Sequence, residues 1–344
     1  MSGNALQNAI RRLAFHDSLT AAESSEAFGV IMRGEATPAQ VAALLMALRI
    51  KGESVDEVAG AASALREAMV HLQADDAEAL VDTCGTGGGT ITTFNISTAA
   101  GLLAAGLGVR VAKHGNRSFT SQCGSADVLE ALGVPLDVAP GVMERALRDA
   151  GIVFMFAPSM HPAMRHVGPV RRELAVPTVM NIVGPLANPA SAGRQVLGVA
   201  EPARMPLLAG ALAALGTRHA LIVHGEPGMD EFSPIGRTHV IEVREGERSE
   251  WSVEPADYGF GAFEASALTG GSPADNARII RGVLAGEGSA AASAAVILNA
   301  AAALYVAGRV ASYADGVELA RQGIADRVGL DSLERLRRAY TTTP

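Results

Sequence analysis

The sequence contains few cysteines, few aromatic residues and no excess of basic residues. Two cysteines among 344 residues cannot form the disulfide framework of a small secreted protein. Aromatic residues make up only 4% of the chain, so the core must be built from alanine, leucine and valine, for which a hydrophobic content of 49% is ample. The formal net charge of −8 disfavours a general nucleic-acid-binding protein, because such proteins normally present a basic surface.

Apolar segments of the kind that enter membranes are also scarce. Residues 1–15 lack the hydrophobic stretch of a signal peptide. The apolar run 289–307 is long enough to cross a bilayer, but it is mostly alanine and carries Asn299, which favours a buried core helix. We therefore predict a cytoplasmic protein with no membrane partner and no nucleic-acid partner.

Residues 4–70 have the punctuation of four consecutive helices. Thr20 and Ser54 each precede a glutamate by three residues, which is the pattern of a capping box, and Thr37 precedes a proline at a first helical position. We predict a helical domain over residues 1–72. Its apolar faces suit either packing on the rest of the chain or a dimer contact.

The second domain, residues 73–344, alternates strand-like and helix-like segments. This alternation predicts an α/β fold with a mainly parallel central sheet flanked by helices. Two antiparallel strands are expected near 238–243 and 251–253, in a less regular region. The other strands are expected near 79–83, 109–112, 152–156, 176–180, 195–199 and 219–224, and helices near 97–106, 125–132, 140–149 and 203–215.

Three segments rich in small, hydroxyl or basic residues follow the first two of these strands. Gly85–Gly89 (Gly-Thr-Gly-Gly-Gly) can let backbone N–H groups approach an anion. Asn95–Thr98 opens a helix, where the helix dipole and unpaired N–H groups favour phosphate. Lys113–Arg117 follows the next strand, and a hydroxyl-rich stretch leads to a helix at Ser125. Ligands bind at such strand ends in open α/β sheets.

The glycine loop alone is equally consistent with a plain tight turn. It is not a P-loop, because no Lys-Ser/Thr pair follows at the required spacing, and it lacks the third glycine of the dinucleotide-binding motif. The combination is more specific. Gly-Thr-Gly-Gly, then Asn-x-Ser-Thr, then Lys-His-Gly-Asn-Arg together resemble the anthranilate phosphoribosyltransferase family, which acts in tryptophan synthesis.

The resemblance extends over almost the whole chain. It includes Met46–Gly52, His161–Arg165, Pro169–Leu174, Asn181–Pro189, His224–Gly225, Met229–Glu231 and Leu298–Gly308. It implies that phosphoribosyl pyrophosphate (PRPP) and anthranilate react to give N-(5-phosphoribosyl)anthranilate and pyrophosphate, with Mg²⁺ as cofactor. It also implies a homodimer through the helical domain, and a segment near 160–190 that crosses back to that domain.

The resemblance also implies which residues bind the substrates and the metal. The expected PRPP contacts are Gly85, Gly88, Gly89, Thr93, Asn95, Ile96, Ser97, Thr98, Lys113, His114, Gly115, Asn116, Arg117, Ser121 and Ser125. Anthranilate is expected at Gly85, Asn116, His161 and Arg171, and Mg²⁺ at Ser97, Asp230 and Glu231. The residue types suit these roles, because lysine supplies a point charge for phosphate, arginine binds carboxylates bidentately, and Mg²⁺ prefers one or two carboxylates plus water and phosphate.

Several of these residues also have an ordinary structural interpretation. Asp230 and Glu231 could form a solvated acidic turn, Arg117 could be a surface residue, and His114 and His161 could be structural. We assign no acid or base, because the aromatic amine of anthranilate is already neutral and loses its proton late, to water or to pyrophosphate.

Three positions depart from the family pattern. Gly89 and Gln122 stand where the family usually has aspartate and a basic residue, which concerns donor and metal binding, and Pro177 stands where it usually has arginine. One alternative function is that of a nucleoside phosphorylase with the same fold, against which Arg171 and the Asp230–Glu231 pair argue. Another is a non-catalytic, nucleic-acid-binding paralogue, against which the net charge of −8 argues.

Overall fold

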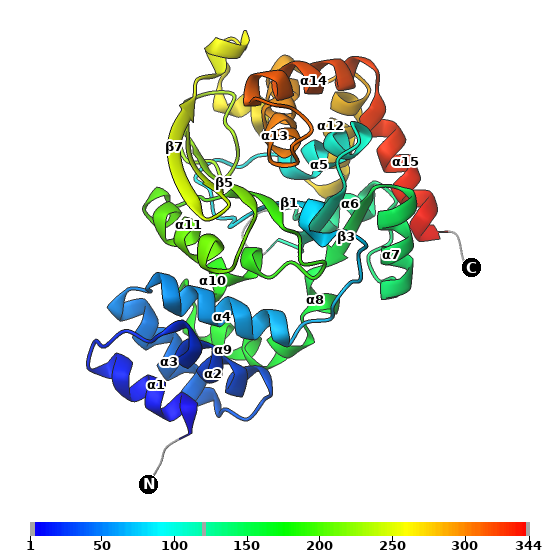
Figure 1. The fold of residues 1–344 in the computed structure, drawn as a ribbon. Coiled ribbons are helices and arrows are strands. Elements are labelled where there is room, and N and C mark those ends of the chain that lie inside the picture. The colour runs from blue at the N-terminus through cyan, green and yellow to red at the C-terminus, as the bar shows by residue number, and fades with distance from the viewer. Residues whose placement is uncertain (1–3, 119–121, 342–344) are drawn as a thin grey trace.

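The computed structural model describes residues 4–118 and 122–341 (Figure 1). A bundle of helices from the N-terminal part of the chain lies against a larger α/β body. The N-terminus is at the far end of the bundle, and the C-terminus lies beside α15 on the α/β body.

Four helices form the N-terminal bundle, as the capping patterns predict. They are α1 (Ala5–Ala14), α2 (Ala21–Met32), α3 (Pro38–Lys51) and α4 (Val55–Glu67). The hydroxyls of Thr20, Thr37 and Ser54 each accept a hydrogen bond from the backbone N–H three residues later, which stabilises the first turn of α2, α3 and α4.

A seven-stranded sheet forms the centre of the α/β body. Its order is β3-β2-β1-β4-β5-β6-β7, with β1 to β5 parallel and β6 and β7 antiparallel. The strands are β1 (Val81–Gly85), β2 (Val111–Gly115), β3 (Ile152–Phe156), β4 (Arg194–Gly198), β5 (His219–Gly225), β6 (Thr238–Arg244) and β7 (Glu247–Val253). The predicted fold class is therefore confirmed. The connection order reverses between β1 and β4, and ligands bind beside such a switch point in this class of sheet.

The predicted strand at 176–180 is wrong. Ala175 has a left-handed conformation, Pro177 is exposed, and Met180 begins a short helix. Val179 and Met180 are buried in the same hydrophobic cluster as the N-terminal helices. The apolar run is thus explained by packing on the helical bundle, which sequence periodicity does not distinguish from burial in a sheet.

Helices and short 3₁₀ turns complete the fold. The helices are α5 (Ile96–Gly106), α6 (Ser125–Ala131), α7 (Pro140–Asp149), α8 (Ala157–Met160), α9 (Gly168–Leu174), α10 (Met180–Val183), α11 (Met205–Ala214), α12 (Pro273–Leu284), α13 (Ala290–Val306), α14 (Tyr313–Ala325) and α15 (Val328–Thr341). The 3₁₀ turns are η1 (Ala77–Ala79), η2 (Pro162–His166), η3 (Gly184–Leu186), η4 (Pro202–Arg204), η5 (Pro255–Tyr258) and η6 (Ala265–Leu268).

Two hydrophobic clusters divide the core between them. One joins α5, α12, α13, α14 and α15 to the sheet. The other joins the N-terminal helices to the segment 163–187, to α11 and to part of β4, β5 and β6. The alanine-rich α13 is buried along most of its length, as expected of a core helix. Among the described residues, no helix is long and apolar enough to cross a membrane.

Candidate active site

The glycine loop after β1 lies directly beside Asp230. The Gly87 N–H donates to Asp230 Oδ2 at 2.8 Å. A Cβ on Gly85 would lie 2.3 Å from Asp230 Oδ2, and one on Gly198 would lie 1.5 Å from the Asp230 carbonyl oxygen. Only glycine therefore permits this approach of the acidic turn to the ends of β1 and β4.

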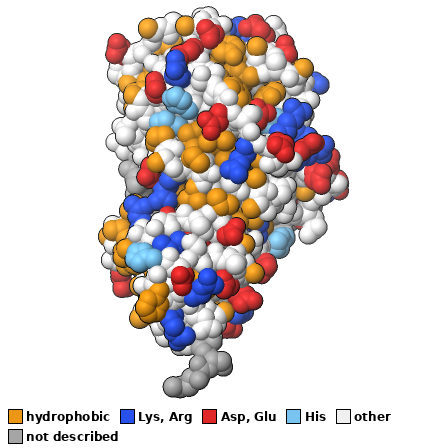
Figure 2. All heavy atoms as spheres, turned by 60° about the vertical axis from the view of Figure 1, so that its left-hand side comes forward, with side chains coloured by type: hydrophobic (Ala, Val, Ile, Leu, Met, Phe, Trp, Pro, Cys, Tyr) orange, Lys and Arg blue, Asp and Glu red, His pale blue; other side chains and the backbone are white. Residues whose placement is uncertain are grey.

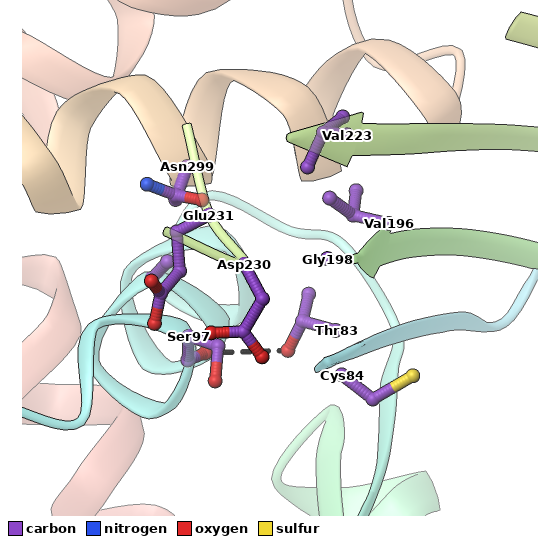
Figure 3. A pocket seen from close by; sticks show the side chains of 10 residues that line it. Thr83, Cys84, Ser97, Val196, Gly198, Val223, Asp230, Glu231 and Asn299 are labelled. Carbon is purple, nitrogen blue, oxygen red and sulfur yellow. Dashed lines mark hydrogen bonds between the residues drawn. The ribbon is translucent and has the colours of Figure 1, made fainter. Parts of the chain in front are cut away.

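A pocket opens at this meeting point of loop, strand ends and acidic turn (Figure 3). Side chains from six separate segments converge on it, including the carboxylates of Asp230 and Glu231 and the hydroxyl of Ser97 at the start of α5. The lining residues are Thr83, Cys84, Ser97, Ala100, Val196, Gly198, Val223, Asp230, Glu231 and Asn299. The pocket lies between β1 and β4, at the switch point of the sheet.

The two carboxylate residues of the pocket are half-buried and have few compensating partners. Burial raises the pKa of Glu231 well above its usual range, and the charge of Asp230 raises it further. Burial also raises the pKa of Asp230, although the hydrogen bond from Gly87 opposes this. Glu231 Oε2 has no hydrogen-bond partner in the described chain. Such a pair attracts a cation or a proton.

The donor set fits a magnesium ion that is shared with a substrate. Among the described residues, no cluster of three or more His, Cys, Asp or Glu side chains could hold a metal on its own. Asp230, Glu231 and the Ser97 hydroxyl supply oxygen ligands at one side of the pocket. Mg²⁺ usually takes one or two protein carboxylates and completes its shell with water and substrate phosphate, so this incomplete set is appropriate to it.

Lys113 places its ammonium group beside the same pocket. The side chain is 3% exposed, and Nζ donates to the Thr83 carbonyl and, at 3.2 Å, to Ser97 Oγ. Burial lowers the pKa of Lys113, while the charges of Asp82 and the acidic turn oppose that shift. The positive charge therefore faces the pocket from within the sheet rather than from a flexible surface position.

The start of α5 is organised by contacts other than an N-cap hydrogen bond. Within the described chain, Asn95 makes no capping hydrogen bond. Its Nδ2 donates to the Cys123 carbonyl at 3.1 Å, and its Oδ1 accepts from Asn276 at 2.9 Å. Thr98 and Ile96 are buried, Thr93 is half-buried, and the Thr98 hydroxyl has no partner in the described chain.

The loop after β2 is held in place by carboxylates and by α6. Arg117 forms ion pairs with Asp127 at 2.7 Å and Glu130 at 3.0 Å, so its charge is already partnered. The Asn116 carbonyl accepts from Ser125 Oγ at 3.4 Å. A Cβ on Gly115 would lie 2.2 Å from that hydroxyl, so the loop packs closely on α6.

Other positions of the predicted donor site are open or fall outside the described chain. Gly88 is exposed with a φ of +83°, and no atom lies within 4 Å of an added Cβ. Gly89 is half-buried, and Gln122 is exposed. Ser121 lies outside the described residues, so the structure gives it no position.

His114 and His161 face each other in the interior. Their Nε2 atoms are 3.1 Å apart, so one ring donates to the other. Burial lowers the pKa of His114 to about 3 and that of His161 to about 4. Both imidazoles are therefore neutral near pH 7, and such low pKa values make them weak bases.

Arg171 lies on α9, which packs on α3 of the helical bundle. Its Nη2 donates to Asn181 Oδ1 at 3.4 Å, a long hydrogen bond, and burial lowers its pKa. Within the described part of the chain it forms no ion pair with a carboxylate. A half-buried guanidinium in this condition can receive the carboxylate of a ligand.

Sequence reasoning missed several residues that shape the pocket. Asp82 and Asn188 are buried and hydrogen-bonded to each other at 2.7 Å. Asn299 on α13 holds the backbone of Phe232, next to the acidic turn, through both its oxygen and its nitrogen. Each of these residues is a polar side chain within an apolar or motif segment, which is a signal that the sequence contains. Its hydrogen-bond partner is distant in the sequence, so the sequence does not show what the side chain binds.

Comparison with known proteins places both parts of the chain in one family. Residues 7–69 match the model of a glycosyl transferase family helical bundle domain, and residues 77–327 match that of the same family's a/b domain. The fold and the pocket thus define a two-domain glycosyl transferase.

Relatives and solved structures narrow this class. An anthranilate phosphoribosyltransferase of Anaeromyxobacter is 50% identical over 96% of this chain and 97% of its own. The crystal structure of that enzyme from Thermus thermophilus has a TM-score of 0.92 at 41% identity, covering 99% of this chain and 100% of its own. The Saccharomyces cerevisiae enzyme in complex with PRPP and Mg has a TM-score of 0.89 at 27% identity, covering 99% of both chains. The chain belongs to the anthranilate phosphoribosyltransferase family, which confirms the resemblance of its motifs.

Proposed function

We propose that this protein transfers the phosphoribosyl group of PRPP to the amine of anthranilate, releasing pyrophosphate, as a step in tryptophan biosynthesis. The observation that carries the proposal is the convergence of Ser97, Lys113, Asp230 and Glu231 at one pocket on the sheet's switch point. Relatives that are about half identical over nearly the full chain support it.

The donor site we propose combines the glycine loop, the start of α5 and the loop after β2. As pyrophosphate leaves, positive charge builds on the ribose and negative charge on the leaving group, so positioning and electrostatics dominate. Lys113 holds a positive charge beside the pocket, and the glycine loop lies at its edge, where the Gly87 N–H donates to Asp230. The proposed PRPP contacts are Gly85, Gly88, Gly89, Thr93, Asn95, Ile96, Ser97, Thr98, Lys113, His114, Gly115, Asn116, Arg117, Ser121 and Ser125.

We propose Ser97, Asp230 and Glu231 as the Mg²⁺ ligands of this chain. When bound, Mg²⁺ would neutralise charge on the pyrophosphate group. The Glu231 oxygen that has no partner among the described residues supports this assignment, since a buried anionic oxygen without a donor is costly unless a cation binds it. Related structures carry Mg, one of them together with PRPP.

We propose that Arg171 binds the anthranilate carboxylate, with Gly85, Asn116 and His161 lining the path of the amine to the ribose. The guanidinium can make two parallel hydrogen bonds to the carboxylate and so orient the ring. The buried, neutral His161 offers a hydrogen-bonding but uncharged surface. The amine needs no prior deprotonation, so its proton can leave to water or to pyrophosphate.

The organisation of the molecule outside the pocket is also a proposal. We infer domains 1–72 and 73–344, with 160–190 joining the first, because residues 163–187 share a cluster with α1 to α4. The predicted homodimer through the helical domain is supported by Phe15 and Ile50, large apolar residues there that are 77% and 71% exposed. The cytoplasmic location stays a prediction.

The alternative functions lack comparable support. The relatives from Anaeromyxobacter and Rubrobacter xylanophilus, which match nearly the whole chain, are anthranilate phosphoribosyltransferases and not nucleoside phosphorylases. On the face shown in Figure 2, acidic and basic side chains are interspersed, whereas a nucleic-acid-binding surface is typically basic.

The proposed reaction can be tested by the loss of anthranilate fluorescence. We expect a loss that requires both PRPP and Mg²⁺, with pyrophosphate formed in equal amount. A folded protein that shows no PRPP-dependent loss at any Mg²⁺ concentration would refute the proposed function.

A further inference from the structure

The ladder between β1 and β2 stops after its first pair. Val81 pairs with Val111, whereas β1 and β4 pair at five successive positions, and so do β2 and β3. If the parallel register continued, the Ala112 carbonyl would accept from the Thr83 N–H, and the His114 N–H would donate to the Thr83 carbonyl. The recorded pairing of these two strands ends at Val81 and Val111, so the ladder does not continue in this way.

Three buried side chains bind three of these four backbone groups instead. Asn188 Nδ2 donates to the Ala112 carbonyl at 2.8 Å. Asp82 Oδ1 accepts from the His114 N–H at 3.2 Å, and Lys113 Nζ donates to the Thr83 carbonyl. Side chain–backbone hydrogen bonds thus replace direct backbone pairing at this end of β1 and β2. Because a side chain is inserted between the two backbones, we infer that the strand ends are farther apart than directly paired strands.

Asp82 and Asn188 form the centre of this bridge. Asn188 Nδ2 also donates to Asp82 Oδ2 at 2.7 Å, and Asn188 Oδ1 accepts from the Ala190 N–H at 2.9 Å. The Asn188 amide is therefore fixed in one orientation. The two side chains are 1% and 6% exposed, so water does not compete for these hydrogen bonds.

The gap lies between the two loops that form the proposed donor site. β1 leads into Gly85–Gly89, and β2 leads into the loop around Asn116. We propose that Asp82 and Asn188 are positioning residues, which hold the ends of β1 and β2 at the separation that PRPP needs between these loops. This inference rests on the proposed function.

The chemistry of the bridge defines a sharp substitution. In Asp82→Asn, the amide oxygen can still accept from the His114 N–H. Its NH₂ group then faces the NH₂ group of Asn188, which cannot turn without losing its bonds to Ala112 and Ala190. One arm of the bridge is lost at nearly constant volume. In the double variant Asp82→Asn/Asn188→Asp, the 82–188 hydrogen bond can form again with donor and acceptor exchanged.

The test compares both single variants and the double variant in the full chain. We expect each single variant to raise the KM for PRPP about tenfold or more, as the loss of a charge-assisted hydrogen bond predicts, with the KM for anthranilate changed less. The double variant should recover part of that loss. Val317→Ala, a buried change in α14, serves as a control for lowered thermal stability alone.

Binding of PRPP by calorimetry without anthranilate provides a readout that needs no turnover. If the wild type shows no turnover, the proposed function fails. Weaker PRPP binding by the variants, together with faster hydrogen exchange at 111–115, would still support the spacing role. A folded Asp82→Asn protein with lowered Tm but wild-type PRPP binding and KM overturns it. If Asp82→Asn does not fold, Tm, PRPP binding and KM for PRPP of Asn188→Asp and of the double variant decide the question in the same way.

Discussion

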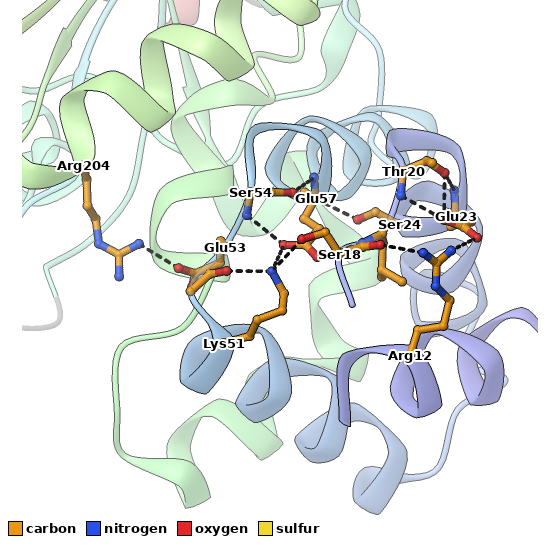
Figure 4. Close-up of polar contacts among 12 residues, drawn as sticks. Arg12, Ser18, Thr20, Glu23, Ser24, Lys51, Glu53, Ser54, Glu57 and Arg204 are labelled. Atoms are coloured by element: carbon orange, nitrogen blue, oxygen red, sulfur yellow. Dashed lines mark hydrogen bonds and ion pairs between the residues drawn. The ribbon is translucent and has the colours of Figure 1, made fainter. Parts of the chain in front are cut away.

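Two clusters of charged side chains, one in the helical bundle and one in the pocket, differ in how many hydrogen-bond and ion-pair partners the protein gives them. In the helical bundle, Glu57 is fully buried and accepts from Lys51 Nζ at 3.0 Å, from the Leu19 N–H at 3.0 Å and from the Ser54 N–H at 2.7 Å (Figure 4). In the pocket, Glu231 lies beside a second carboxylate and keeps an oxygen without a partner in the described chain.

The difference separates a charge that serves the fold from one that serves a ligand. Both oxygens of Glu57 meet donors that the protein itself supplies, so desolvation is compensated before any ligand binds. Burial and the charge of Asp230 raise the pKa of Glu231, and Lys113 offsets this rise only in part. Incomplete pairing in a pocket, rather than burial itself, therefore indicates the functional site.

The strongest test of the structural side of this comparison is Glu57→Gln. The change leaves the Lys51 ammonium buried without its carboxylate, so we expect a loss of unfolding free energy of about 3–5 kcal/mol in urea titrations. Turnover per folded molecule should not change. Glu67→Gln, on the exposed face of the same helix, is the control. Equal stability of the two variants would contradict the assignment.

The matching change in the pocket is Asp230→Asn with Glu231→Gln. We expect turnover to fall by about 10²–10³, as for the removal of groups that stabilise transition-state charge. Because both carboxyls have raised pKa values, their ionised forms destabilise the fold near neutral pH, so the variant should be as stable as the wild type or more stable. Glu226→Gln, an exposed change in the same turn, is the control. If the double variant kept its activity at low Mg²⁺, Asp230 and Glu231 would be residues of an ordinary turn and not metal ligands.

Asp82 is an intermediate case, buried but well hydrogen-bonded. Burial raises its pKa from 3.8 to about 6, against the opposing effects of Lys113, Asn188 and His114. A raised pKa stabilises the fold at low pH, and this contribution is lost as pH rises through about 6. Relative to Asp82→Asn, the wild type should lose about 2 kcal/mol of unfolding free energy between pH 4 and 6.5 in urea titrations. For the exposed Asp75→Asn, the difference in unfolding free energy from the wild type should not change with pH. The same pH-independent difference for Asp82→Asn would refute the prediction.

Arg171 extends the comparison to a cation. Arg171→Ala removes the proposed bidentate clamp, and we expect the KM for anthranilate to rise about tenfold or more, with the KM for PRPP little changed. The KM of Arg171→Lys for anthranilate should lie between those of the wild type and Arg171→Ala, because lysine keeps the positive charge but cannot make two parallel hydrogen bonds. The exposed neighbour Arg172 provides the control Arg172→Ala. Equal effects on both KM values would place Arg171 elsewhere.

Gly89 tests whether added charge in the pocket loop matters. A Cβ there would lie 2.9 Å from the Gly228 carbonyl oxygen, so any side chain shifts the loop slightly. Gly89→Asp adds a carboxylate near Asp230, whereas Gly89→Asn makes the same steric change without the charge. We expect a few-fold difference between them in KM for PRPP and a shifted Mg²⁺ optimum. Superimposable Mg²⁺ titrations of the two would show that charge at position 89 has no role.

Local patterns predicted much of the fold. The capping residues Thr20, Thr37 and Ser54 mark the starts of three helices, because each cap satisfies donors within its own first turn. The strands β3, β5 and β6 were placed to within about one residue, because their apolar runs are short and bounded by turns. The segment 176–180 failed because burial against the bundle produces the same apolar run.

By itself the sequence determined the family, the α/β class, the helical domain and the residue types that suit phosphate, carboxylate and Mg²⁺, because motifs and periodicity are local. Only the tertiary structure decided which of these groups are already partnered. It joins Arg117 to two carboxylates, leaves a Glu231 oxygen without a partner among the described residues, and brings Asp82 to Asn188 across 106 positions. Such partners are chosen by the packing of distant strands and helices, and burial then determines how strongly each unpaired charge favours a ligand.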